Sequence, residues 1–427
     1  MKPHVCDHHS GLLRLDAAVE RLLQQIQPIT ERERLPIGQA LGRVLASDIP
    51  SPLDLPSFTN SAMDGYAARA TDAQPGARLR VVGTSLAGQP YRGNLDIGEC
   101  IRIFTGACLP PVTDVVVVQE EVERQGSDIV LKIQAPLRPG ENVRLQGEEL
   151  KAGDRLLSGG QLLEPAGIGL LALTGFREID VIRRPRVAFI ATGDELVQPG
   201  QHLEPGFIYD SNRPVLTALC QQLGLETLDL GVIRDDRAAL TTALGSAVLQ
   251  ADALITMGGA SVGEADFMVD VLRELGTVEF WKVAIKPGKP FLHGRIGDTP
   301  IFGLPGNPVS MMVTFLQLAR PALQRRMGMR VGRPVRWPVR CQTRITKSPG
   351  RLEFQRGMLD WRGGRACVTP LRGQGSHRLT SMSRANCFIV LPEDCTRVEE
   401  GDTVEIEPFG GGFVNPDPSW LAPEITI

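Results

Sequence analysis

The sequence predicts a multidomain protein in which a three-layer α/β domain lies between two regions rich in β-strands. Between residues 183 and 330, short apolar runs alternate with amphipathic stretches, an order typical of a parallel sheet with helices on both faces. Residues 78 to 146 and the chain beyond residue 330 instead contain short β-type runs separated by glycines. The length of 427 residues also exceeds the roughly 250 at which single cores stop growing.

Composition narrows the class of protein further. A hydrophobic content of 42% and a charged content of 22% are ordinary for a soluble protein, and the net charge of -3 argues against a nucleic-acid binder. None of the eight cysteines forms a C-x-x-C pair, which argues against a zinc site or a disulfide framework. The N-terminus has no apolar signal region, and no apolar run approaches the ~18 residues of a membrane span. We therefore expect a cytoplasmic enzyme with no membrane partner.

The N-terminal region is expected to be helical and then irregular. Leucines, Val19 and Ile26 recur at spacings of three and four over residues 11 to 27, and Pro28 ends the pattern. A second short helix is expected over residues 38 to 49. Residues 50 to 60 are rich in Pro and Ser and form a loop that leads to the SAMDGYAAR motif.

The next region is expected to be a β-rich insertion. Its clearest strands are the runs LRVVGTSLAG, ECIRIFTGA, DVVVVQEEVE and DIVLKI. A helix then starts at Glu164 and Pro165 and runs toward Leu173, and the first helical region is expected to pack beside it. The predicted domains are a segmented N-terminal domain (11–48 and 147–182), the β-rich insertion (49–146), the α/β domain (183–330) and a C-terminal domain (331–410).

The last two domains have the clearest patterns. The C-terminal runs PVRCQTRITKS, EFQRGMLDW, RACVTPL, NCFIVLP and DTVEIEPF predict a small barrel or sandwich. The α/β domain is predicted to contain strands at 187–192, 226–233, 252–256, 278–285 and near 300–303, with helices near 213–223 and at 236–249, 266–275 and 308–327.

A ligand site is predicted in residues 256 to 310, where three Gly-rich turns each follow an apolar run. Glycines allow the backbone to approach a phosphate closely, and a helix N-terminus offers unpaired N–H groups. Lys286 and Lys289 frame a Pro-Gly turn, and GLPGNP opens a helix at Pro308. Any one of these turns is also explained as an ordinary strand-to-helix connection. Three together, with acids and lysines, favour a phosphorylated or oxyanionic ligand.

The motifs that carry this chemistry are predicted to share one edge of the sheet. TGDEL, RDD, GGASVGEAD and LPGNP each follow a predicted strand, and ligands of parallel sheets bind at the carboxyl ends of the strands. Lys282 and Lys286 are four apart on one predicted strand and would share a face.

Nine short motifs, in order, resemble the molybdopterin molybdenumtransferase (MoeA) family. They are NSAMDGYA, RIFTGA, TGDEL, YDSN, GVIRDD, SVGEAD, FWKVAIKPGKP, GLPGNPVS and QGSH, and the resemblance extends from about residue 11 to residue 409. It implies four domains: a segmented N-terminal domain, a β-rich insertion, an α/β molybdopterin-binding domain and a C-terminal β-barrel. It also implies an enzyme that inserts molybdenum from molybdate into adenylated molybdopterin, with Mg²⁺ and with release of AMP.

The resemblance also assigns site residues. It implies catalytic roles for the acids Asp64, Glu195, Asp235 and Asp266, for Thr105, and for Lys282 and Lys286. Asp235, Asp266 and Glu195 would hold Mg²⁺, which takes hard oxygen ligands. The molybdopterin substrate would be bound by Gly258, Gly259, Ser261, Gly263, Glu264, Lys289, Pro305, Gly306 and Pro308.

Three of these acids have a simpler explanation. Asp235 is suited to a helix N-cap, Asp64 to a turn before Gly65, and Glu195 to a solvated loop. The chain also departs from the family pattern at four positions, Thr59, Glu149, Met257 and Ala260.

Two alternative functions are weighed against molybdenum insertion. The 186–330 domain also resembles molybdopterin adenylyltransferases, and some animal relatives act as scaffolds. SAMDGYA, the β-rich insertion and the C-terminal domain favour insertion, because adenylyltransferases resemble the α/β domain alone. The resemblance further implies a homodimer with sites shared between subunits. Other molybdenum cofactor biosynthesis proteins are candidate partners.

Overall fold

The computed structural model describes residues 11–234, 236–258 and 267–409, which form two compact units. The first unit contains the chain up to Glu33, the short segment Gly42–Val44 and the chain from Val181 onward. The second contains Arg34–Leu41 and Leu45–Asp180. Across the described residues, no helix is both long and apolar enough to cross a membrane.

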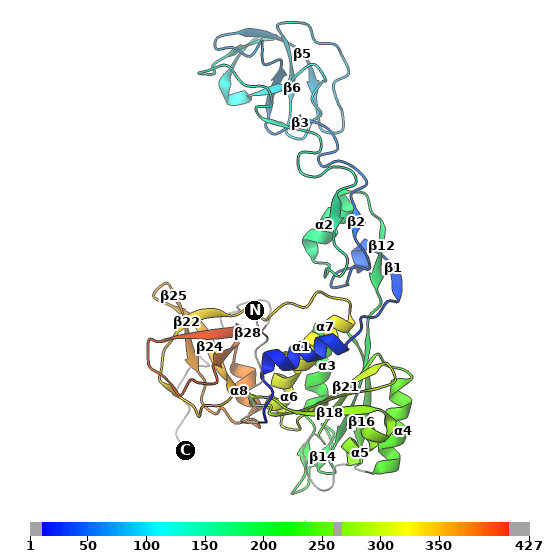
Figure 1. Cartoon of the computed structure of the whole chain (residues 1–427). Helices are drawn as coiled ribbons and strands as arrows, with labels where there is room; N and C mark the ends of the chain where they lie inside the picture. Colours follow the sequence, from blue (N-terminus) through cyan, green and yellow to red (C-terminus); the bar gives the residue numbers. More distant parts are fainter. Residues whose placement is uncertain (1–10, 235, 259–266, 410–427) are drawn as a thin grey trace, which may run out of the picture. The chain divides into compact units, whose positions relative to one another are not determined.

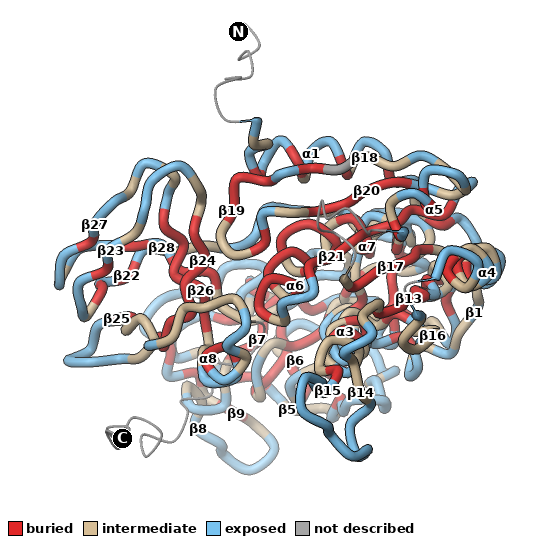
Figure 2. The backbone as a smooth tube through the Cα atoms, turned by 90° about the horizontal axis from the view of Figure 1, so that it is seen from below, coloured by how far each residue is buried: buried red, intermediate tan, exposed pale blue. Residues whose placement is uncertain are grey.

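A six-stranded sheet forms the centre of the first unit (Figure 1). Its strand order is β16-β13-β17-β21-β20-β18, and β13 pairs in parallel with both β16 and β17. The central strands β13 and β17 are buried over most of their length (Figure 2). The strands are β13 (Arg186–Thr192), β16 (Glu226–Ile233), β17 (Ala253–Met257), β18 (Thr277–Lys282), β20 (Pro290–Ile296) and β21 (Thr299–Leu304).

The sheet differs from the expected parallel one at β20, which runs antiparallel to both β18 and β21. Gly297 and Asp298 alone separate β20 from β21, and Gly297 has φ +56°. A two-residue Gly-Asp connection between apolar runs is a hairpin signal, and a hairpin makes neighbouring strands antiparallel. The predicted α/β order holds for the other five strands.

Helices cover both faces of this sheet, as expected for a three-layer fold (Figure 1). On one face, Leu240 and Leu244 of α4 and Val271 of α5 pack on strand residues such as Ile190 and Leu254. The predicted helix at 308–327 forms as α6 and α7 joined by a π-helical segment. The bounds are α1 (Leu15–Gln25), α3 (Asn212–Gln222), α4 (Arg237–Val248), α5 (Phe267–Leu275), α6 (Pro308–Thr314), η3 (Phe315–Ala319) and α7 (Arg320–Arg326).

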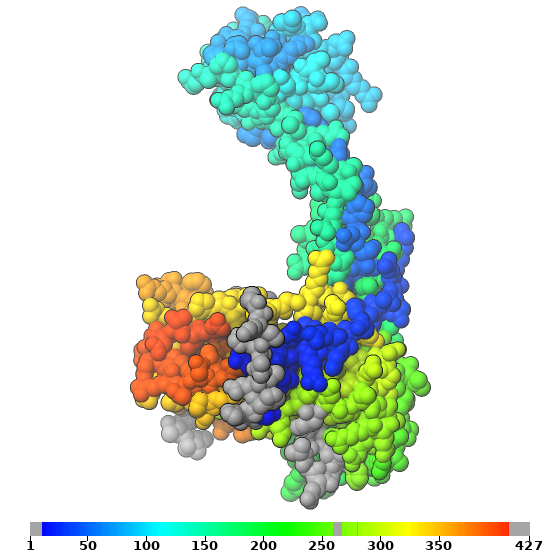
Figure 3. Space-filling view, in the orientation of Figure 1, coloured from blue at the N-terminus to red at the C-terminus, as the bar shows by residue number. Residues whose placement is uncertain are grey.

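A closed five-stranded barrel forms the C-terminal part of the first unit. Its order is β24-β25-β22-β28-β26, and β26 pairs back with β24. The barrel residues, orange to red, gather in one continuous body (Figure 3). The structure thus selects the barrel over the sandwich. The bounds are β22 (Trp337–Cys341), β23 (Ile345–Thr346), β24 (Leu352–Arg362), β25 (Arg365–Pro370), α8 (Leu379–Arg384), β26 (Cys387–Leu391), β27 (Arg397–Val398) and β28 (Thr403–Pro408).

Short strands of the described first unit also lie outside the barrel ring and the central sheet, among them β23 and β27, which pair antiparallel with each other. β19 (Ile285–Lys286) is parallel to β24 and extends the barrel ladder by one strand. β14 (Leu196–Val197) and β15 (Ile208–Tyr209) form a parallel pair after β13.

The second unit is built around a β-rich core. A six-stranded sheet of order β7-β4-β6-β5-β9-β8 encloses apolar residues such as Val115, Val117 and Ile129. Early strands also pair with late ones: β2 with β11 and β3 with β10. The bounds are β1 (Arg32–Pro36), η1 (Ile37–Gln39), β2 (Ile49–Pro50), β3 (Asn60–Ser61), β4 (Gly65–Ala68), β5 (Arg78–Ser85), β6 (Glu99–Ile103), β7 (Val115–Val118), η2 (Gln119–Glu121), β8 (Val122–Gln125), β9 (Asp128–Leu131), β10 (Val143–Arg144), β11 (Arg155–Leu157), α2 (Pro165–Leu173) and β12 (Glu178–Ile182).

The helix expected over residues 38 to 49 is wrong. Only the 3-10 turn η1 forms there, and β2 occupies the end of the stretch. Gly42 has φ +70°, a left-handed conformation that ends a right-handed helix. The first predicted helix begins at Leu15 rather than at residue 11, because Leu13 forms a bridge with Val283.

Candidate functional site

The site is built on one edge of the central sheet. β16, β13, β17 and β21 are parallel, and β18 has the same direction because both it and β21 are antiparallel to β20. Their carboxyl ends therefore lie on a common edge, where ligands of such sheets bind. The prediction that four motifs begin on one edge is confirmed for the described residues. Asp235, Gly259, Ala260, Ser261, Gly263, Glu264 and Asp266 lie outside them.

Two of the predicted glycine turns meet at this edge. Gly258 has φ +86°, and a Cβ atom there would lie 2.7 Å from the carbonyl oxygen of Thr192. A side chain is therefore excluded at this position. A Cβ atom at Gly306 would lie 3.9 Å from Cα of Gly258, so the turns after β17 and β21 are neighbours. The structure thus brings Gly258 to the turn that contains Pro305, Gly306 and Pro308.

The start of α3 fixes the second of these turns. The Nδ2 of Asn212 donates to the carbonyl oxygen of Gly306 at 2.7 Å. Asp210, which is buried, accepts from the backbone N–H of Asn212 at 2.9 Å and from Nε of Arg213 at 2.6 Å. In the sequence, Asp210 and Asn212 belong to the YDSN motif, for which no role was predicted. Asp and Asn directly before a predicted helix often hydrogen-bond to neighbouring backbone groups, and this pattern could have indicated their role.

Glu195 follows β13 on an exposed turn. Its Oε2 lies 2.8 Å from the position a Cβ atom would take at Gly193. Among the described residues its carboxylate has no ion-pair or hydrogen-bond partner. Within this part of the chain, no three His, Cys, Asp or Glu residues gather to hold a metal ion. Since Asp235 and Asp266 are outside the described residues, the three-acid cluster stays a prediction.

The lysines do not share one strand, contrary to expectation. β18 ends at Lys282, which pairs with Pro290 at the start of β20. Lys286 belongs to the separate strand β19, so the face argument based on a continuous strand is wrong. Lys282 and Lys289 are exposed, and Lys286 is half-buried.

The turn between Lys286 and Lys289 is fixed by packing. Gly288 has φ +102°, and a Cβ atom there would lie 2.6 Å from Cγ2 of Thr314 in α6. Only glycine fits this close approach. The two lysines are therefore carried by a turn that packs directly on the helix that follows the Gly306 turn.

The barrel also reaches this edge, which the sequence analysis did not predict. β19 and β24 place Lys286 opposite Glu353, whose Oε1 lies 3.3 Å from the lysine Nζ. The carbonyl oxygen of Ser376 accepts the N–H of Val309 at 3.0 Å. The helix start at Pro308 was expected to offer free N–H groups. One of them, the N–H of Val309, is already bound to Ser376.

A buried arginine holds the barrel loop in this position. Arg356 donates to the carbonyl oxygens of Gly373 and Gly375, each at 3.1 Å, and to Oγ of Ser381 at 3.2 Å. Burial lowers the pKa of Arg356 to about 10, which still leaves it charged at neutral pH. The backbone loop of the QGSH motif is therefore anchored beside the start of α6.

Asp64 and Thr105 form a hydrogen-bonded pair in the second unit. Oδ1 of Asp64 accepts from the backbone N–H of Thr105 at 2.8 Å and from its hydroxyl at 2.7 Å. The Thr105 N–H, then its hydroxyl, hold the pKa of Asp64 below its ordinary value. The pair forms because Asp64 precedes β4, and Thr105 follows β6, its antiparallel neighbour.

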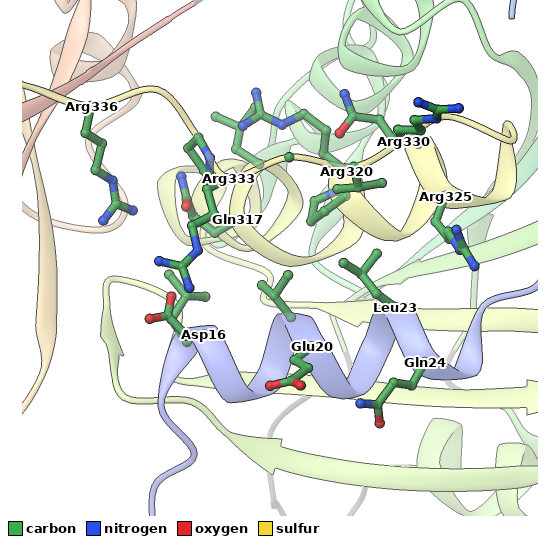
Figure 4. Close-up of a pocket in the computed structure, with 18 residues that line it drawn as sticks. Asp16, Glu20, Leu23, Gln24, Gln317, Arg320, Arg325, Arg330, Arg333 and Arg336 are labelled. Atoms are coloured by element: carbon green, nitrogen blue, oxygen red, sulfur yellow. The ribbon is translucent and has the colours of Figure 1, made fainter. Parts of the chain in front are cut away.

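A large cavity of about 850 Å³ is lined by a different set of residues (Figure 4). It is formed by α1, by η3 and α7, and by residues 330 to 336. Asp16 and Glu20 of α1 line it opposite Arg320, Arg325, Arg330, Arg333 and Arg336. None of the residues predicted to act on a ligand lines this cavity, so its volume does not mark the candidate site.

Comparison with known proteins defines the class. Residues 13–175 match the MoeA N-terminal region (domain I and II), residues 188–325 a probable molybdopterin binding domain, and residues 338–409 the MoeA C-terminal region (domain IV). A molybdopterin-binding α/β domain flanked by these regions is the fold described above.

Relatives that match over more than 90% of this chain indicate the same class of protein. The molybdopterin molybdenumtransferase of Haemophilus influenzae is 42% identical over 400 residues, which cover 93% of this chain and 99% of the relative. Molybdopterin molybdenumtransferase 2 of Mycobacterium tuberculosis is 36% identical, covering 91% and 96%. The crystal structure of the molybdopterin biosynthesis MoeA protein of Pyrococcus horikoshii OT3 is 30% identical with a TM-score of 0.79, covering 93% and 100%. The chain belongs to the MoeA family, the molybdopterin molybdenumtransferases.

Proposed function

We propose that the chain transfers molybdenum from molybdate to adenylated molybdopterin and releases AMP. The observation that carries this is the lysine turn of residues 286 to 289, packed against the helix that follows the Gly306 turn. Molybdate and the phosphates of the second substrate are anions, which ammonium groups and glycine backbone N–H groups bind. Lys286, Lys289 and the turns at Gly258 and Gly306 supply both kinds of group at one sheet edge.

Magnesium is part of this proposal. The exposed Glu195 carboxylate is a hard oxygen donor of the kind Mg²⁺ takes, and Asp235 and Asp266 would complete the set. The ion, when bound, supplies polarisation of the phosphoanhydride. The lysines bind and orient the anions, while Asn212 keeps the Gly306 turn in place.

Release of AMP is the direct test. Purified protein is mixed with adenylated molybdopterin and Mg²⁺, with or without molybdate, and AMP is measured by chromatography. The proposal expects AMP release that depends on molybdate. Formation of adenylated molybdopterin from ATP would instead support the adenylyltransferase, and tight binding without any turnover would support a scaffold.

We also propose a homodimer in which each site combines Asp64 and Thr105 of one subunit with Lys286 and Asp266 of the other. Support comes from the family resemblance. Asp64→Asn and Asp266→Asn proteins are each expected to be inactive. In a mixed dimer, one of the two sites carries both changes and the other neither, so activity up to about half of wild type is expected. If mass measurement shows mixed dimers and no activity returns, the shared site is wrong.

Finally, we propose that the enzyme works in the cytoplasm. Its seven cysteines within the described residues are all free thiols, as in proteins of reducing compartments. Cell fractionation with detection of the untagged protein tests this location, and recovery of the protein in a secreted fraction would contradict it.

A further inference from the structure

Glu353 of the barrel and Lys286 of the lysine turn form an uneven ion pair. The β19–β24 register places the two residues directly opposite each other, and Nζ lies 3.3 Å from Oε1. The Glu353 side chain is 5% exposed, whereas that of Lys286 is 45% exposed. The carboxylate is therefore fixed inside the protein, while the lysine extends from it to the surface of the candidate site.

The pair is poorly suited to stabilise the fold. Oε1 of Glu353 also accepts from Nε2 of Gln355 at 3.1 Å, but the buried Oε2 has no hydrogen-bond partner in the described chain. A buried carboxylate loses its hydration, and an unpaired oxygen leaves part of that cost without compensation. A buried group of this kind needs a reason other than stability.

We propose that Glu353 is a positioning residue, contributed by the barrel, that holds the Lys286 ammonium where it meets the anionic substrate. The inference rests on the proposed molybdenum transfer. A free lysine side chain loses rotamer entropy when it is fixed. Glu353 fixes the chain before substrate arrives, and since an ammonium has three donors, two remain for the anion.

Positioning and simple electrostatics predict opposite results for Glu353→Gln. The substitution removes a negative charge beside an anion site, so electrostatics alone would make molybdate bind more tightly and leave turnover unchanged or higher. If Glu353 positions Lys286, turnover falls because the ammonium is no longer held in register. The sign of the change in kcat therefore separates the two.

The test uses the full-length protein and molybdate-dependent AMP release. We expect Glu353→Gln to lower kcat by about tenfold, since small misplacements of a reacting group are costly. In a Lys286→Ala background, adding Glu353→Gln should change kcat by less than about twofold, because Glu353 acts through Lys286. The matched control is Glu407→Gln, a buried carboxylate elsewhere in the barrel. It should lower the melting temperature and leave kcat within about twofold.

A second measurement does not depend on turnover. Wild-type protein and Glu353→Gln are treated with a limiting amine-acylating reagent, and modification of each lysine is followed by mass spectrometry. Release from the carboxylate should raise acylation of Lys286 by about threefold or more relative to Lys347, a barrel lysine held by backbone carbonyls.

The outcomes separate two failures. Wild-type protein that releases no AMP contradicts the proposed function, and the acylation ratio then still tests the ion pair. With an active wild type, the inference is overturned if Glu353→Gln keeps or raises kcat. The inference is also overturned if Glu353→Gln lowers kcat as much in the Lys286→Ala background as in the wild type, or if Glu407→Gln lowers kcat as much as Glu353→Gln. An unchanged acylation ratio would overturn it as well.

Discussion

Two glutamates of the barrel are buried to the same degree but are partnered very differently. Glu407 is 5% exposed, and its Oε1 accepts from Gln317 at 2.7 Å while Oε2 accepts from Arg336 at 3.1 Å. Arg320 adds an ionic contact, with its Nη2 atom 3.8 Å from Oε1. Glu353, 4% exposed as a whole residue, shares one oxygen between Lys286 and Gln355, and its other oxygen has no hydrogen-bond partner among the described residues.

The difference separates a structural carboxylate from one that serves a site. Both carboxylate oxygens of Glu407 accept hydrogen bonds, one from Gln317 of η3 and one from Arg336 of the segment before β22. Removing one member of this cluster therefore leaves a buried charge without a partner. Within the described residues Glu353 forms its ion pair with one half-exposed lysine, and that lysine stands at the sheet edge where the glycine turns meet. We expect Glu407 to act on stability and the Glu353 region to act on ligand binding.

Glu407→Ala should cause the largest change, a loss in the free energy of unfolding. The substitution leaves Arg336, Arg320 and Gln317 without their shared acceptor, and removal of one partner of a buried pair costs on the order of 3 kcal/mol. Urea unfolding followed by tryptophan fluorescence measures the change. Glu405→Ala, an exposed position on the same strand, is the control. Equal midpoints for the two variants would show that the cluster does not hold the barrel.

Lys286→Ala should have a smaller effect on stability and a large one on ligand binding. Loss of one charge-assisted hydrogen bond weakens molybdate binding by about ten- to a hundredfold. Lys286→Arg should keep part of the affinity, because an arginine replaces the charge but not the compact ammonium. Titration calorimetry at low salt measures both, with Lys132→Ala as the surface control. Wild-type affinity in the alanine variant would remove Lys286 from the site.

Thr105→Val should have the smallest effect, because Asp64 is held by neutral donors near the surface. The pKa of Asp64 is lower in the native state than in the unfolded state. The ionised carboxylate therefore stabilises the native state at pH values above the unfolded-state pKa, and this stabilisation is lost as the pH falls through the native-state pKa. Removing the Thr105 hydroxyl should move the acid limb of unfolding to slightly higher pH. Carbon NMR of the Asp64 carboxyl during acid titration measures the pKa directly, and Thr105→Ser serves as the control. An unchanged pKa in the valine variant would show that the hydroxyl contributes nothing.

Much of the fold was predictable because its signals are local. The strand predicted at residues 226 to 233 has those bounds, and Glu164 with Pro165 correctly indicated the start of α2. Apolar periodicity, a proline at the first helical turn and a turn glycine are read within a few residues. The same kind of signal was misread at residues 38 to 49, where Gly42 interrupts the helical pattern.

The candidate site was only partly predictable because its positioning contacts are long-range. EFQRG indicated a strand, but nothing in it shows that Glu353 pairs with Lys286 across the β19–β24 register. The hydrogen bond from Asn212 to Gly306 likewise joins two separate motifs. Sequence patterns predicted the lysines and the glycine turns. Which side chains position them depends on strand register, which the sequence does not show.

The β19–β24 ladder has a consequence for modularity. Leu352 donates its N–H to the carbonyl oxygen of Ala284 at 2.8 Å, so the barrel and the segment that carries the lysine turn share backbone hydrogen bonds. A chain cut after Arg330 would retain every residue of the central sheet and lose the strand on which β19 is built. The border expected near residue 330 is therefore not a place where this protein can be divided without dismantling the lysine turn.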